Sequence, residues 1–139
     1  MTLGYLVNPD LTSRKIEFEL EQAAQFLGRV ESDRVSVAFQ EDGTALAALY
    51  SPDAREDGSE PNPVASMARN EAATGNSAFY TDPTTAICGP VIFVGVAGED
   101  ISDADIERVE HGIRAARNYR ADEPEDFQLW RDAVINLHS

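Results

Sequence analysis

Alternating apolar and polar positions predict two β-hairpins in the first fifty residues. Leu3–Val7 is a short apolar run that ends at the turn Asn8–Asp10, and Arg14–Phe18 follows with a period of two. Val35–Phe39 alternates in the same way, and Ala45–Tyr50 is its return arm. We expect both hairpins to bury one face in a common core.

The period becomes helical between and after the hairpins. Leu20–Leu27 has apolar residues at i, i+3, i+4 and i+7, and Gly28 is a typical C-terminal stop. Asn62 fits an N-cap, with Pro63 as the first residue of a helix that continues to Gly75. Both helices are expected to pack on the sheet.

The last third of the chain predicts a buried strand and two helices. Phe79–Tyr80 and Thr84–Cys88 have strand-like composition, and the unbroken apolar run Val91–Val96 predicts a central strand covered on both faces. Ser102 starts a long helix whose inner stripe is Ile106, Val109, Ile113 and Ala116. A final helix from Pro124 presents Phe127, Trp130, Val134 and Leu137 on one face, and we expect Trp130 to be buried.

These elements predict an α+β fold. It consists of a small mixed or antiparallel sheet of about five or six short strands, with helices packed on it and two C-terminal helices. We expect a single domain over residues 1–139, with a core at 3–120 and a C-terminal helical extension at 123–139. A chain of this length buries roughly two thirds of its unfolded surface, so it needs no disulfide or metal to fold.

Charge restricts the possible partners. The chain has 25 Asp and Glu against 11 Lys and Arg, a net charge of −14. Because phosphate recognition needs a basic surface, we expect no direct binding of nucleic acid, and a basic protein is the better electrostatic match. The apolar runs are too short to cross a bilayer and the first residues do not fit an export signal. We therefore expect a cytoplasmic protein without a membrane segment.

Candidate catalytic and metal-binding groups are few. Cys88 lies in an apolar segment without a histidine nearby, which favours a small buried side chain over a nucleophile. His111 follows Glu107 by four residues, but two ligands without a third are a weak metal signal. We expect His111 to be exposed, and we predict no catalytic residue, metal or cofactor.

The segment Ser51–Pro63 is the candidate binding region. Its three prolines, glycine and four carboxylates are typical of a mobile, solvated loop with nothing apolar to bury. Asn62 joins this loop to a helix whose first amides could hold an anion, although capping alone also explains it. The candidate binding residues are Asn62, Asn70, Asp53, Glu56, Asp57 and Glu60.

The order of elements and several short motifs are similar to a known family. They include the paired first strands, the hairpin over Val35–Tyr50, Pro61–Asn62 before a short helix, and Ile87–Gly95 followed by acidic residues. Over roughly residues 3–110 the chain resembles the accessory proteins of bacteria, phages and plasmids known as domain of unknown function 3846. The loop Asp53–Glu60 and the helix from Pro124 depart from it. The resemblance implies a mobile-element setting and does not identify an activity or a catalytic residue.

Three functions are compatible with these features. We favour a non-enzymatic accessory protein that binds a basic protein or forms a homo-oligomer. The alternative is a small ligand-binding domain or enzyme with a site near the Asn62 loop. A DNA mimic or antirestriction-type inhibitor is a further possibility, because 14 charges match about seven base pairs if aligned. The acidic stripe with Asp103 and Glu107 continues into Arg114, which disfavours mimicry.

Overall fold

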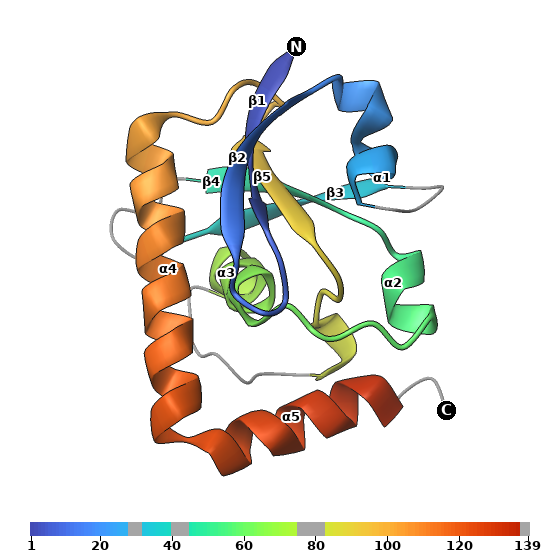
Figure 1. The fold of residues 1–139 in the computed structure, drawn as a ribbon, viewed down its shortest axis with the longest axis vertical. Helices are drawn as coiled ribbons and strands as arrows, with labels where there is room; N and C mark the ends of the chain where they lie inside the picture. Colours follow the sequence, from blue (N-terminus) through green and yellow to red (C-terminus); the bar gives the residue numbers. More distant parts are fainter. Residues whose placement is uncertain (28–31, 40–44, 75–82, 137–139) are drawn as a thin grey trace.

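The computed structural model of the protein describes residues 1–27, 32–39, 45–74 and 83–136, with Glu56 described by its backbone alone. A five-stranded antiparallel sheet has the order β2-β1-β5-β4-β3, which confirms the predicted α+β class. Figure 1 shows this sheet with helices around it. The strands are β1 (Thr2–Val7), β2 (Ser13–Phe18), β3 (Asp33–Ala38), β4 (Ala45–Tyr50) and β5 (Val91–Gly95).

Both predicted hairpins and the predicted central strand are confirmed. β1 pairs with β2, β3 pairs with β4, and β5 lies between β1 and β4 with all its residues buried. The strand predicted at Thr84–Cys88 is wrong. Pro83–Thr85 forms a short 3₁₀ helix, η2, and Cys88 makes a single bridge to Pro61. Pro83 has no backbone N–H to donate to a neighbouring strand, so it opposes strand pairing at the start of this segment. The strand-like pair Phe79–Tyr80 lies outside the described residues.

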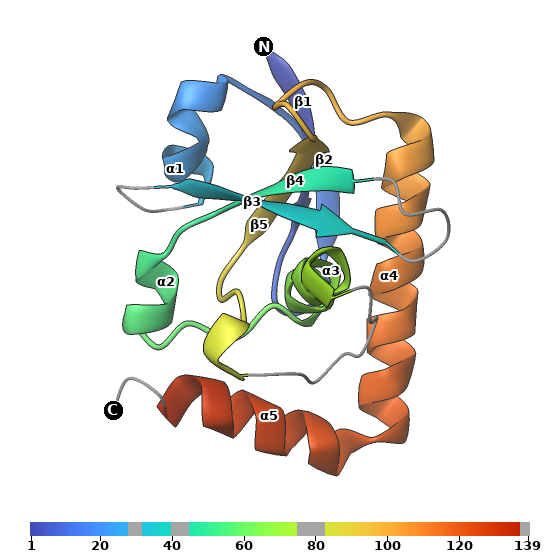
Figure 2. The same cartoon turned by 180° about the vertical axis from the view of Figure 1, so that it is seen from behind.

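The expected common core of the two hairpins is confirmed, and a second core, to which both hairpins also contribute, covers the other face of the sheet. Ile16 and Phe18 from the first hairpin pack on one face with η1 (Leu20–Gln22) and α1 (Ala23–Phe26). Val37 and Phe39 of the second hairpin pack on the other face, together with Tyr5 and Val7 of the first hairpin. Alternate residues of β5 point to opposite faces, and helices cover both of them (Figure 2). The Gly28 stop and the hairpin turn at 41–43 lie outside the described residues.

Two long helices, α3 (Pro63–Thr74) and α4 (Asp103–Asp122), cover the face of the sheet that contains Val37 and Phe93. The predicted inner stripe of α4 is buried: Ile106, Val109, Ile113 and Ala116. The predicted cap is also present, because the Ser102 hydroxyl accepts a hydrogen bond from the Asp105 amide at 3.1 Å. Gly112 lets α4 approach closely, because a Cβ there would lie 2.9 Å from a ring carbon of Phe39.

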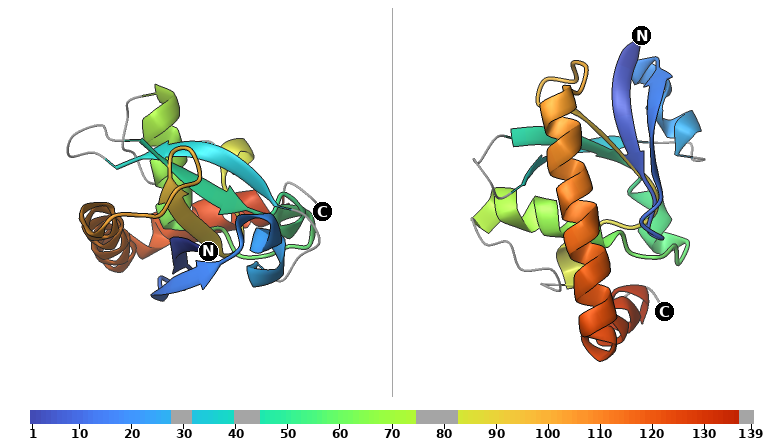
Figure 3. Two further views of the ribbon diagram at one scale, coloured as in Figure 1. Left: turned by 90° about the horizontal axis from the view of Figure 1, so that it is seen from above. Right: turned by 60° about the vertical axis from the view of Figure 1, so that its left-hand side comes forward.

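Helix α5 (Pro124–Asn136) does not lie on the sheet. It turns away from α4 and crosses one end of the molecule (Figures 1 and 3). Trp130 and Val134 are buried there, as predicted, and Leu137 lies outside the described residues. They form a small third cluster with Ala54, Ala86 and Cys88. None of the helices in the described part of the chain is both long and apolar enough to cross a membrane.

Candidate functional site

Asn62 is completely buried and joins three elements. Its Nδ2 donates to the carbonyl oxygens of Val7 and Gly89, both at 3.1 Å, and its Oδ1 accepts the Ala65 amide at 3.2 Å. The last bond confirms the predicted cap of α3. The first two bonds tie that cap to the end of β1 and to the turn before β5. Asn62 thus acts here as a structural junction, and its side chain is not exposed to a ligand in this conformation.

Two further hydrogen bonds extend this junction. The Asn62 amide donates to the Ile87 carbonyl at 2.8 Å, and the Gly89 amide donates to the Glu60 carbonyl at 2.9 Å. The buried Ser66 hydroxyl accepts the Ile87 amide at 2.9 Å. Residues 60–62 and 87–89 therefore form a short extended pair. Ser66 was missed in the sequence, because a serine inside a helix carries no local signal of a partner 21 residues away.

The acidic segment differs from the expected loop without buried apolar groups. Asp53–Glu56 forms the short helix α2, and Ala54 is only 1% exposed. Ala54 packs against Ala86, Cys88 and Trp130. The expectation that this segment has nothing apolar to bury is wrong, because Ala54, Pro61 and Pro63 are all buried.

The candidate acids do not gather around Asn62. Asp53 is partly buried and Asp57 is exposed, whereas the side chain of Glu56 is outside the description. Asn70 lies two turns along α3, where its carbonyl accepts the Thr74 hydroxyl at 2.9 Å. The predicted binding residues are thus spread along the surface, with Asn62 in the interior.

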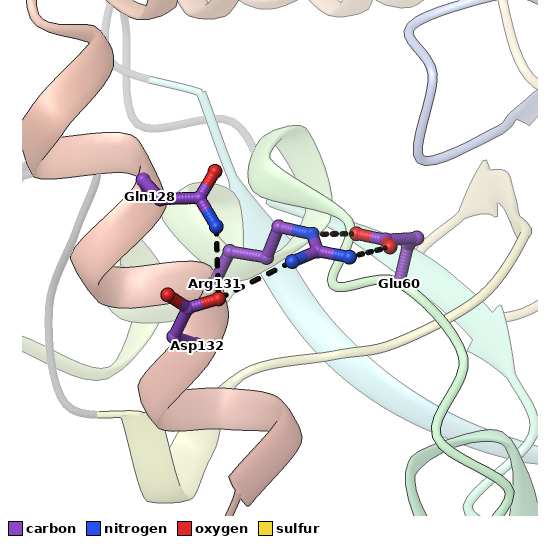
Figure 4. A network of polar contacts seen from close by, with 4 residues as sticks. All are labelled: Glu60, Gln128, Arg131 and Asp132. Atoms are coloured by element: carbon purple, nitrogen blue, oxygen red, sulfur yellow. Dashed lines mark hydrogen bonds and ion pairs between the residues drawn. The ribbon is translucent and has the colours of Figure 1, made fainter.

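Glu60 has a specific partner on α5 (Figure 4). Its carboxylate accepts from Arg131 Nε at 2.6 Å and from Arg131 Nη2 at 2.5 Å. Arg131 also meets Asp132 at 3.2 Å, and Gln128 donates to the same carboxylate at 2.9 Å. The hydrogen bonds that Arg131 donates to Glu60 raise the pKa of the Arg131 guanidinium. Glu60 therefore holds α5 against the loop, a role that the sequence did not reveal.

Next to the Asn62 junction lies a pocket that we call the arginine pocket. Its volume is about 160 Å³, and it is lined by Tyr50, Ser51, Pro52, Arg55, Arg69, Ala86, Ile87 and Cys88. Arg55 Nη1 donates to the Thr84 carbonyl at 2.5 Å and Arg55 Nη2 donates to the Pro83 carbonyl at 2.5 Å. Arg69 Nη1 donates to the Thr85 carbonyl at 3.1 Å. Both guanidinium groups therefore bind the backbone of η2.

The arginine pocket was missed in the sequence. The only available signal was the presence of Arg55 within an otherwise acidic segment. Cys88 in its wall is buried, as predicted, and burial raises the pKa of its thiol from 9.0 to about 11. The thiol is therefore protonated at neutral pH. Because the thiolate is the reactive form, this environment disfavours nucleophilic chemistry at Cys88.

The outer face of α5 is the second candidate surface. Leu129 is 71% exposed, although it is an apolar residue on a helix whose other side is buried. Glu125, Asp126 and Asp132 lie three or four positions from Leu129 and are exposed. Residues at this spacing are neighbours on a helix. We call these four residues the α5 outer face, an apolar centre with an acidic rim.

The described residues contain no candidate metal centre. There, no three His, Cys, Asp or Glu side chains lie close enough to hold a metal ion. His111 is exposed on α4, as expected, and His138 lies outside the described residues.

Comparisons of the chain with models of known protein families, with curated protein sequences and with solved structures give no match.

Proposed function

We propose that this protein is a non-enzymatic binding protein that docks on a basic protein through the α5 outer face. The observation that carries the proposal is Leu129, a largely exposed leucine with exposed carboxylates three and four positions away on the same helix. Protein interfaces commonly combine an apolar centre with a polar rim. An acidic rim selects a basic partner and increases the association rate.

The attachment of α5 supports this proposal. The inner side of α5 is occupied by the Trp130 cluster and by the Glu60–Arg131 ion pair, so the helix is held while its outer side stays exposed. The net charge of −14 adds long-range attraction to a basic surface. On α4, by contrast, the exposed Arg114 and Arg117 follow the acidic residues. We therefore do not extend the proposal to mimicry of DNA.

The test is capture of a partner from an extract of the organism that encodes the protein. Wild type, Leu129→Ser and a double variant, Glu125→Gln with Asp126→Asn, are immobilised in parallel. Val96→Ser is the matched control, because Val96 is also an exposed apolar residue, 53% exposed, but lies after β5. We expect wild type and Val96→Ser to retain the same basic protein and the two α5 variants to lose it.

Salt provides the second arm of the test. Screening shortens the range of charge interactions from about 10 Å at 0.1 M to about 3 Å at 1 M ionic strength. The basic protein should therefore elute with salt. Equal retention by Leu129→Ser would refute the proposed surface. Recovery of a salt-resistant homo-oligomer alone would replace the basic partner by a second copy of the chain.

A further inference from the structure

We propose that the arginine pocket binds a small carboxylate of a few carbon atoms. The proposal goes beyond the docking function and uses none of its residues. Its basis is a set of hydrogen-bond donors that the protein itself leaves unused around one cavity.

Two residues that line the pocket each have a buried polar atom without a hydrogen-bond partner. Ser51 is 3% exposed and its hydroxyl has no hydrogen-bond partner, and the same holds for the buried Nε of Arg55. Three of the five N–H groups of Arg55 are used by carbonyl oxygens, which leaves the Nε–H and one N–H of Nη2. Unsatisfied buried polar groups are rare in folded proteins, and a bound water or ion is one explanation for them.

The charges around the pocket favour an anion. Arg55 and Arg69 bind only backbone carbonyls, and neither pairs with a carboxylate in the described part of the chain. The nearby Glu60 is held by Arg131. The Cys88 thiol is neutral at pH 7 and does not oppose a bound anion. The pocket is therefore a local positive site in a strongly acidic protein.

The shape of the site favours a carboxylate over phosphate. Adjacent N–H groups of a guanidinium match the two oxygens of a carboxylate. The remaining walls from Tyr50, Pro52 and Ile87 suit a short hydrocarbon chain, whereas they would leave the further oxygens of a phosphate without donors. A volume of about 160 Å³ admits an acid of propionate size and excludes a folded peptide segment.

Propionate is the probe for the test. The protein of residues 1–139, labelled with ¹⁵N, is titrated with sodium propionate against sodium chloride of equal ionic strength. We expect saturable chemical-shift changes at the amides of Ser51, Arg55, Arg69 and Ile87. Arg69→Gln removes one of the two positive charges that line the pocket and should weaken binding about tenfold. Arg114→Gln, which alters an exposed arginine of α4, should leave the affinity unchanged.

Ser51→Ala gives an independent measurement that does not depend on Arg69→Gln being folded. Removal of an unsatisfied hydroxyl should raise the melting temperature without propionate and reduce the further rise that propionate produces. The proposal is overturned if propionate causes no saturable change, if neither pocket variant weakens binding, or if inorganic phosphate binds more tightly than propionate.

Discussion

Helices α3 and α5 both attach to the segments 54–62 and 86–89, but different interactions hold them there. The start of α3 is attached by hydrogen bonds of the buried Asn62, which reach Val7, Gly89 and Ala65. Hydrogen bonds are directional, so this junction fixes the position of α3 relative to two strands. Its polar groups all have partners inside the protein.

The attachment of α5 depends mainly on apolar contact. Trp130 and Val134 are buried against Ala54, Ala86 and Cys88, and Phe127 packs at the edge of the cluster. The Arg120 guanidinium lies 5.4 Å from the centre of the Phe127 ring, and the Glu60–Arg131 pair lies at the surface. The cluster is small and separate from the two cores of the sheet.

The contrast separates what folds the domain from what is available for binding. α3 is part of the sheet core, and its junction cannot open without loss of several buried hydrogen bonds. α5 is attached along one side only, so its outer face can meet a partner while the sheet stays intact. The following experiments test this contrast, from the largest expected effect to the smallest.

Trp130→Ala should release α5 while the sheet stays folded. Trp130 is 5% exposed, so its truncation should cost about 3–5 kcal/mol of the free energy that holds α5. Denaturant unfolding with hydrogen exchange measures this, and the amides of α5 should lose protection while those of β5 keep it. Leu129→Ala on the opposite side of α5 is the control and should change stability by less than about 0.5 kcal/mol. A midpoint equal to wild type would contradict the packing of Trp130.

Asn62→Ala should instead destabilise the whole domain. The variant removes the cap of α3 and leaves two buried carbonyl groups without a donor, for an expected loss of about 2–4 kcal/mol. Exchange protection of α3, β1 and β5 should fall together. Asn118→Ala, an exposed asparagine of α4, is the control. If only α3 lost protection, Asn62 would be a simple cap and not the junction of three elements.

Alkaline pH should weaken the attachment of α5 through Cys88. The folded thiol has a pKa of about 11 against an ordinary 9.0, so the unfolded state loses its proton first as the pH rises. The stabilisation is complete below pH 9 and is lost between pH 9 and 11, by about 2–3 kcal/mol. Unfolding of wild type and Cys88→Ala is compared across this range. Parallel pH profiles of the two proteins would show that the thiol is not desolvated.

Glu60→Gln should have the smallest effect. Glu60 and Arg131 are 49% and 31% exposed, and exposed ion pairs contribute little even with bidentate geometry. We expect a melting temperature lower by about 2 °C or less at low salt, and no difference in high salt. Glu125→Gln, which removes an equal charge from the outer face of α5, is the control. A loss as large as that of Trp130→Ala would mean that charge, and not apolar contact, attaches α5.

Local patterns in the sequence were sufficient for most of the elements. The two hairpins, the central strand, the caps at Asn62 and Ser102 and the buried side of α5 were all predicted. Each depends on residues within one helical turn or one strand, where periodicity and capping act. The burial of Cys88 followed in the same way from its apolar neighbours.

The binding candidates show where local reasoning ended. Asn62 was recognised as a cap, but its bonds to Val7 and Gly89 span 55 and 27 residues. The four acids were singled out for their charge, whereas Arg55 between them and Arg69 on the next helix line the pocket. A guanidinium that binds the carbonyls of a distant turn leaves no periodic signal in the chain.

The sequence by itself determined the type and order of the elements and the net charge of −14, because these depend on residue identity and short-range spacing. Only the tertiary structure decided that both faces of the sheet are buried in separate cores, that Ala54 is buried and that residues 83–85 form η2 and not a strand. The arginine pocket and the exposure of Leu129 belong to the same group. These features arise where segments far apart in the chain meet, and the free energy of such contacts depends on their relative position in space.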